Sequence, residues 1–183
     1  KGTGQGWITA EYSMMPGSTN SRVSRNNTNS GRTKEIQRLI GRSLRAVVDL
    51  NQIGENSLLV DCDVLNADGG TRTASIIGSV IALRNSITKL QSSNVLANDI
   101  KFNSIAAISV GIVNNEIKLD LNYEEDFQAS VDFNFVMDDM GNIIEVQGTG
   151  ESGAFSKTQL IQATEMAESA IKDIISIQKE YFD

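Results

Sequence analysis

Histidine is absent from this sequence of 183 residues, and the absence excludes several kinds of active site. Ser-His-Asp and Cys-His nucleophile systems need an imidazole as their general base. Imidazole is also a common ligand of zinc. Chemistry in this chain must therefore come from carboxylates, hydroxyls, arginines and backbone amides.

Cysteine, proline and long apolar runs are also scarce. The one cysteine, Cys62, has no partner for a disulfide, and the chain starts without a charged-then-apolar leader, so we expect a reducing, cytoplasmic location. The single proline argues against a Pro-rich linker protein, and no run of eighteen apolar residues could span a bilayer, so no membrane partner is expected. A hydrophobic fraction of 40% suits one globular domain over residues 1–183.

The net charge of −7 means that nucleic-acid binding would need a local basic patch. Two groups of arginines could form one. Arg22 and Arg25 lie in a polar loop at 16–31, where we favour RNA contact. Arg38, Arg42 and Arg45 share one face of a predicted helix, where contact with RNA or an acidic partner is weighed equally against a solvated face or ion pairs in an oligomer.

The pattern of apolar residues predicts a mixed α+β domain. Helical spacing is found at 33–49, 71–90 and 156–182, and strand-like runs occur at 7–12, 57–64, 104–113, 116–122, 129–137 and 142–148. Strand 57–64, the glycine turn that follows it, helix 71–90 and strand 104–113 predict a right-handed βαβ crossover with both strands in one sheet. The expected architecture is a mixed sheet with helices packed on it.

Residues 68–75, DGGTRTAS, combine a tight glycine turn with the start of a helix. Unpaired N–H groups and a positive dipole end favour an anion there, and the segment places Gly70, Thr71 and Arg72 around it. Arg32 stands at a second helix start, where a cation opposes the dipole unless an anion compensates. A phosphate site is predicted. The alternative, a plain turn with a solvent-facing arginine, stays open for this motif alone.

Acidic residues recur at intervals of six at Asp120, Asp126 and Asp132. A pair of strands could bring Asp120 and Asp126 together, and two close carboxylates can hold Mg²⁺ or share a proton. On spacing alone, a solvated cluster is the more frequent explanation.

Five motifs in order resemble the bacterial ribonuclease PH family: GWITAEY at 6–12, GRTKEIQRLIGRSLR at 31–45, DCDV at 61–64, ADGGTRTA at 67–74 and IEVQGT at 144–149. The resemblance implies a ribosomal-protein-S5-domain-2-like fold and a homohexamer built as a trimer of dimers. It also implies phosphorolysis of the 3′ ends of tRNA precursors and other RNAs, with inorganic phosphate as co-substrate and nucleoside diphosphates as products.

The resemblance also assigns residues. Arg32, Gly70, Thr71 and Arg72 match the family's phosphate-binding motifs. Asp120 and Asp126 match its acidic pair, which implies binding of Mg²⁺ or Mn²⁺ and acid–base roles.

Two departures from the family accompany these matches. Gly17 and Asn20 stand where the family has an arginine and a histidine, which bears on RNA contact and ring assembly through that loop. The family also has an N-terminal hairpin that would precede Lys1, so we expect an open sheet edge and a sequence that is part of a longer protein.

Two other functions compete with an active exoribonuclease. One is a catalytically silent RNA-binding ring subunit of an exosome-like assembly, and the other is a different phosphate-using enzyme on the same scaffold. The presence of Arg32, Arg72, Asp120 and Asp126 favours the active enzyme.

Overall fold

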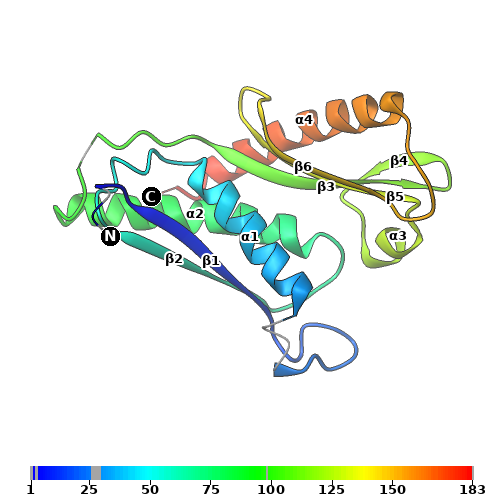
Figure 1. The fold of residues 1–183 in the computed structure, drawn as a ribbon, viewed down its shortest axis with the longest axis horizontal. Coiled ribbons are helices and arrows are strands. Elements are labelled where there is room, and N and C mark those ends of the chain that lie inside the picture. The colour runs from blue at the N-terminus through cyan, green and yellow to red at the C-terminus, as the bar shows by residue number, and fades with distance from the viewer. Residues whose placement is uncertain (1, 3, 26–29, 98, 183) are drawn as a thin grey trace.

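The structure is a computed structural model that describes residues 2, 4–25, 30–97 and 99–182. Figure 1 shows the order of the elements along the chain. The strands are β1 (Trp7–Met14), β2 (Ser57–Val64), β3 (Ile105–Val113), β4 (Glu116–Leu119), β5 (Val131–Asp138) and β6 (Ile143–Gly150). The helices are α1 (Gly31–Arg45), α2 (Thr71–Ser92), α3 (Tyr123–Gln128) and α4 (Lys157–Lys179).

The strands form two separate sheets. β1 and β2 pair in parallel, from Trp7 opposite Ser57 to Met14 opposite Val64. The second sheet is antiparallel, in the order β4-β3-β5-β6, with a register shift at Val136 and Met137 where β5 meets β6.

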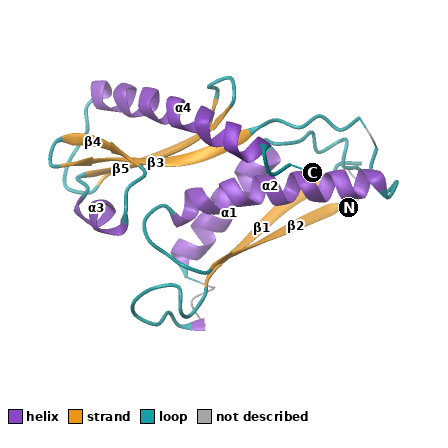
Figure 2. Cartoon of the chain, turned by 180° about the vertical axis from the view of Figure 1, so that it is seen from behind, coloured by secondary structure: helices purple, strands orange, loops and turns teal. Residues whose placement is uncertain are grey.

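Helices and sheets alternate in layers. α1 and α2 lie between the two sheets, and α4 covers the opposite face of the four-stranded sheet (Figure 2). β3 is therefore buried on both faces: Ile105 and Ala107 join the core with α1 and α2, while Val110 and Ile112 join the core with α4. This double burial explains why its sequence is a continuous apolar run rather than an alternating one.

The predicted βαβ crossover is wrong. β2 pairs with β1, whereas β3 pairs with β4 and β5, so the strands before and after α2 lie in different sheets. The physical reason is that β3 needs apolar cover on both faces, and the centre of the four-stranded sheet supplies it.

Most other predicted elements are confirmed, with shifted ends. The first helix covers Gly31–Arg45 rather than 33–49, and the strand after the turn ends at Leu119. Asn114 and Asn115 take the positive φ angles of 52° and 67° that the predicted hairpin turn requires. Ser156 caps α4 in a capping box, as its position predicted.

Helix α3 was not predicted. Its N-terminus is a capping box in which the Asn122 side chain accepts from the Glu125 N–H and the Glu125 carboxylate accepts from the Asn122 N–H. The N-x-x-E spacing in the sequence was the available signal.

Both strands of the smaller sheet have a free edge, because the described β1 and β2 pair only with each other. Within the described ranges β2 pairs only with β1, and its alternate residues are half-buried and exposed. None of the helices in the described part of the chain is long and apolar enough to cross a membrane.

Candidate active site

The N-terminus of α2 is open to an anion. Gly70 caps it in the left-handed region, at φ 68°, and in the described part of the chain no side-chain hydrogen bond caps this helix start. Among the described helices α2 is alone in this, because Ser30, Asn122 and Ser156 cap α1, α3 and α4. Uncapped N–H groups at a helix start form a ready site for an anion.

Thr71 and Arg72 stand at this open end. The Thr71 hydroxyl shares a hydrogen bond of 2.9 Å with the Tyr12 hydroxyl of β1. The Arg72 side chain is 19% exposed, and its Nη1 lies 3.5 Å from Glu35 Oε1 and 3.4 Å from Gln147 Oε1. The structure thus places a hydroxyl and a guanidinium next to the uncapped amides.

Asp120 lies on the other side of the glycine turn. It follows β4 with a φ of 53°, and a Cβ built at Gly70 would lie 3.6 Å from its Oδ1. The turn is held there because the Tyr123 N–H donates to Asp68 Oδ1 at 2.6 Å. One predicted carboxylate and the predicted phosphate loop are therefore neighbours.

Asp126 reaches this region by a route that the sequence did not predict. It lies on helix α3, so the expectation that paired strands bring Asp120 and Asp126 together is wrong. Residues 120–128 leave the sheet after β4 because the Asn122–Glu125 capping box starts a helix there.

Asp132, on β5, lies near both the acidic Asp126 and the basic Arg72. Burial raises its pKa, and the nearby charge of Asp126 raises it further, while Arg72 and a hydrogen bond of 3.1 Å from Asn134 act against the shift. Asp132 therefore lies within electrostatic range of both Asp126 and Arg72. Asp132 is half-buried, so its carboxylate is partly desolvated.

Arg32 lies in the first turn of α1 and is exposed. It lines a cavity of about 60 Å³ together with Tyr12, the residue that also contacts Thr71. One turn further along α1, Glu35 contacts Arg72. The starts of α1 and α2 thus lie close together beside Tyr12. Arg32 and Arg72 could therefore bind the same polyanion.

Arg22 and Arg25 are exposed in the loop after β1, and residues 26–29 of that loop lie outside the described residues. Backbone hydrogen bonds tie the loop to the end of β2: the Met15 N–H donates to the Val64 carbonyl at 3.0 Å, and the Ala67 N–H donates to the Ser18 carbonyl at 2.7 Å. The two arginines therefore stand on a segment that adjoins the glycine turn.

The arginines of α1 do not form a free basic stripe. Arg42 makes an ion pair of 2.7 Å with Glu145 of β6. Arg45 lies 4.5 Å over the Trp7 ring and donates to the Ile8 carbonyl at 2.9 Å, and burial followed by the charge of Arg42 lowers its pKa. Arg38 is exposed, and among the described residues it makes no ion pair or ring contact of this kind. Contacts within the chain therefore account for two of the three arginines on this face of α1.

The donor set suits a hard cation held partly by its substrate. Within the described ranges no group of three or more acidic, cysteine or histidine side chains is placed to hold a metal ion. Mg²⁺ commonly binds through one or two carboxylates plus waters and substrate phosphates. The predicted pair Asp120 and Asp126 would supply such carboxylates, and a closed protein cage is not needed.

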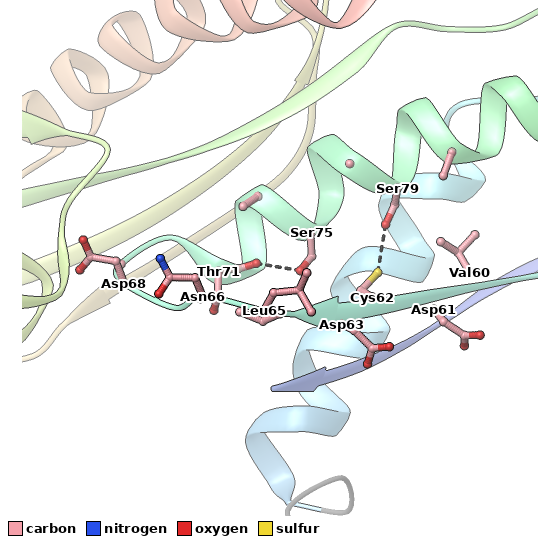
Figure 3. Close-up of a pocket in the computed structure, with 15 residues that line it drawn as sticks. Val60, Asp61, Cys62, Asp63, Leu65, Asn66, Asp68, Thr71, Ser75 and Ser79 are labelled. Carbon is pink, nitrogen blue, oxygen red and sulfur yellow. Dashed lines mark hydrogen bonds between the residues drawn. The ribbon is translucent and has the colours of Figure 1, made fainter. Parts of the chain in front are cut away.

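A larger cavity, of about 530 Å³, lies between β2 and α2 (Figure 3). Cys62 points toward α2, with its Sγ 3.0 Å from Ser79 Oγ, while Asp61 and Asp63 point to the other side of the strand. The cavity therefore adjoins the start of α2 at Thr71 but is not lined by Arg72, Asp120 or Asp126.

The sequence analysis did not single out four residues that contact the site: Tyr12, Glu35, Glu145 and Gln147. All four lie inside the motifs that carry the family resemblance. Their roles depend on contacts between distant segments, which the spacing within one motif does not show.

Comparison with known proteins identifies the family. Sequence profiles of the 3′ exoribonuclease family match residues 1–88 with its domain 1 and residues 103–170 with its domain 2. Ribonuclease PH of Corynebacterium kroppenstedtii is 48% identical over 98% of this chain and 72% of its own length.

Solved structures show the same fold at low identity. Rice (Oryza sativa) Rrp46 matches with a TM-score of 0.72 at 17% identity, over 98% of this chain and 74% of its own. The Archaeoglobus fulgidus exosome with RNA bound to the active site gives a TM-score of 0.74 at 17% identity, over 93% and 70%. The layered arrangement is that of the ribonuclease PH fold, which is S5-domain-2-like, as the motifs implied. With two family profiles and a relative of this identity spanning almost the whole sequence, the chain belongs to the 3′ exoribonuclease family of ribonuclease PH.

Proposed function

We propose that this protein is a phosphate-dependent 3′-to-5′ exoribonuclease that trims the 3′ ends of tRNA precursors and releases nucleoside diphosphates. The observation that carries the proposal is the uncapped start of α2, which has Arg72 in its first turn and Asp120 beside its glycine cap. An anion site that adjoins a carboxylate suits a reaction in which an anionic nucleophile and a metal-bound anionic substrate must meet.

Phosphate binding follows from the groups at the two helix starts. The N–H groups of the first turn of α2, the Thr71 hydroxyl and the Arg72 guanidinium would hold inorganic phosphate, with Arg32 adding a second guanidinium. Tyr12 orients the Thr71 hydroxyl through their shared hydrogen bond. Fixed donors of this kind offset the repulsion between phosphate and an equally anionic phosphodiester.

In the reaction a phosphate oxygen attacks the phosphorus of the last phosphodiester, and the bond from that phosphorus to the 3′ oxygen of the preceding nucleotide breaks. The departing 3′ oxygen takes the proton that the attacking hydrogen phosphate loses, and the terminal nucleotide leaves as a nucleoside diphosphate. No histidine is needed. The carboxylates of Asp120 and Asp126 would hold Mg²⁺ or Mn²⁺, which when bound neutralises charge on the reacting phosphates.

RNA would approach over the loop that carries Arg22 and Arg25. Both side chains are exposed, and the loop is hydrogen-bonded to the segment that leads into the glycine turn. Arginines in such a place would bind the backbone phosphates of RNA without reading its sequence. The description of the Archaeoglobus fulgidus exosome as having RNA in its active site supports an RNA substrate for this fold.

The test is to incubate the protein with a 3′-extended tRNA and Mg²⁺, with and without inorganic phosphate, and to identify the released nucleotides. We expect nucleoside diphosphates that form only when phosphate is present. Monophosphates formed without phosphate would show hydrolysis instead, and RNA binding without any release would show a silent subunit.

The same proposal includes a homohexamer built as a trimer of dimers. Exosome assemblies have subunits of this fold, and an archaeal exosome core matches this chain with a TM-score of 0.72. Sedimentation of the purified protein checks this assembly. We expect one species of six subunits, and a monomer at micromolar concentration would contradict it.

A further inference from the structure

A chain of polar contacts crosses from α1 through β6 to α2 and ends on Arg72. Arg42 Nη1 donates to Glu145 Oε1 at 2.7 Å, and Gln147 Nε2 donates to the same oxygen at 3.3 Å. Arg72 Nη1 in turn donates to Gln147 Oε1 at 3.4 Å. Figure 1 shows that α1 and α2 pass beneath the sheet that contains β6. Three elements that are distant in sequence thus meet at one guanidinium.

Glu145 is the unusual member of this chain. Its side chain is 9% exposed, whereas its ion-pair partner Arg42 is 54% exposed. Its second oxygen, Oε2, is buried and has no hydrogen-bond partner. Burying a carboxylate with an unsatisfied oxygen destabilises a fold, so stability does not explain why a carboxylate stands at this position.

The carboxylate does determine the orientation of the neighbouring amide. Glu145 and Gln147 are two residues apart on β6, so their side chains lie on the same face of the strand. An ionised carboxylate only accepts hydrogen bonds, so it selects the NH₂ end of the Gln147 amide. The carbonyl end is then left to face Arg72.

The same nitrogen of Arg72 also contacts α1. Glu35 Oε1 lies 3.5 Å from its Nη1, and the Glu35 side chain is 51% exposed. Both contacts to Arg72 are long, so phosphate oxygens can compete with them. A neutral amide at position 147 orients the guanidinium without neutralising it, whereas a second carboxylate would compete with an anion for the same charge.

We propose that Glu145 and Gln147 are positioning residues for phosphate. Glu145 fixes the amide of Gln147, and that amide holds Arg72 beside the open start of α2 while leaving its charge available. This inference rests on the proposed function, because the binding of phosphate by Arg72 is part of that proposal.

The test compares four variants in steady-state phosphorolysis at varied phosphate and varied RNA concentrations. Gln147→Leu removes the oxygen that accepts the hydrogen bond from Arg72. Glu145→Gln removes the carboxylate that fixes the orientation of the Gln147 amide. The double variant Glu145→Gln/Gln147→Glu keeps a hydrogen-bonded pair on β6 but places a charge against Arg72. Gln162→Leu, on the exposed side of α4, is the matched control.

We expect Gln147→Leu, Glu145→Gln and the double variant each to raise the KM for phosphate roughly tenfold, as loss of an orienting partner does. The KM for RNA and the melting temperature of the double variant should stay close to the wild-type values, and the control should match the wild type throughout. A structural role alone would predict normal phosphate KM in the double variant, since its pair of side chains is still hydrogen-bonded.

Two failures are distinguishable. If the wild-type protein releases no diphosphates with phosphate, the proposed function fails and this inference with it. If the wild type is phosphorolytic and Arg72→Lys raises the phosphate KM, but Gln147→Leu and the double variant keep the wild-type KM, the inference alone is overturned.

Discussion

Gly69 lies against the backbone of Leu121 so closely that a Cβ at position 69 would be 1.9 Å from the Leu121 carbonyl oxygen. This contact joins the loop before α2 to the turn after β4. It brings Gly70 next to Asp120 and so couples the anion site to the first of the predicted carboxylates. The absence of a side chain at position 69 is a condition for assembling the site.

Replacing Gly69 by alanine should separate these two segments. The three nearest atoms to the new Cβ all belong to the backbone of Leu121 and Asn122. No side-chain rotation can relieve the clash, and we expect a loss of stability of about 1–3 kcal/mol or more. Urea denaturation of the variant measures it. Gly78→Ala is the control: a Cβ there meets nothing within 4 Å, so alanine on this exposed helical position should stabilise by about 0.5–1 kcal/mol.

Arg72→Ala and Asp126→Asn should each abolish phosphorolysis while leaving the fold intact. Removal of a group that stabilises reacting phosphates lowers the rate by roughly 10²–10³. Phosphate-dependent release of nucleoside diphosphates measures the loss, with circular dichroism and sedimentation as checks of structure and assembly. Lys89→Ala, at the far end of α2, should retain full activity. A variant that loses its assembly instead of its chemistry would show that these residues are structural.

The stability of the protein should depend on pH through Asp132. Its pKa in the folded chain is raised above the ordinary 3.8, mainly by burial, so in the window above 3.8 the folded state binds more protons at this position than the unfolded state does. The contribution of Asp132 to stability is therefore largest below pH 3.8 and is lost as the pH rises through the folded-state pKa.

Asp132→Asn tests this sign. The asparagine can still accept the hydrogen bond from Asn134 but carries no charge to desolvate. We expect the variant to be more stable than the wild type at neutral pH and the difference to disappear as the pH falls well below 3.8, where the carboxyl is protonated in both states. Equal stabilities at every pH would contradict the prediction.

Cys62 should react slowly with alkylating reagents. Burial raises its pKa and the carboxylates of Asp61 and Asp63 add to this, while the hydrogen bond with Ser79 acts in the opposite direction. The thiolate is the nucleophile, so iodoacetamide should react more slowly with the folded chain than with the urea-unfolded chain at about pH 8.

Two substitutions should move the reactivity of Cys62 in opposite directions. Ser79→Ala removes the hydrogen bond that favours the thiolate and should slow alkylation, while Asp61→Asn removes a repelling charge and should speed it. If both variants react at the wild-type rate, access to the cavity and not the pKa controls the reaction.

The amino-acid sequence by itself determined the local elements and the family. The lack of histidine limited the chemistry to carboxylates and arginines, the motifs from 6–12 to 144–149 indicated ribonuclease PH, and periodicity located three of the four described helices. The cap of α4 and the turn after β3 could also be predicted from the sequence. The hydrogen bonds of Ser156 and the positive φ angles of Asn114 and Asn115 involve only neighbouring residues.

Only the tertiary structure decided which segments meet. The continuous apolar run of β3 was compatible with several partners, and its placement at the centre of the four-stranded sheet followed from the need to bury both faces against helices. The approach of Gly69 to Leu121 and the contacts of Arg72 with Glu35 and Gln147 join residues 37 to 75 positions apart. Such contacts depend on how whole layers pack, and no spacing within a motif specifies them.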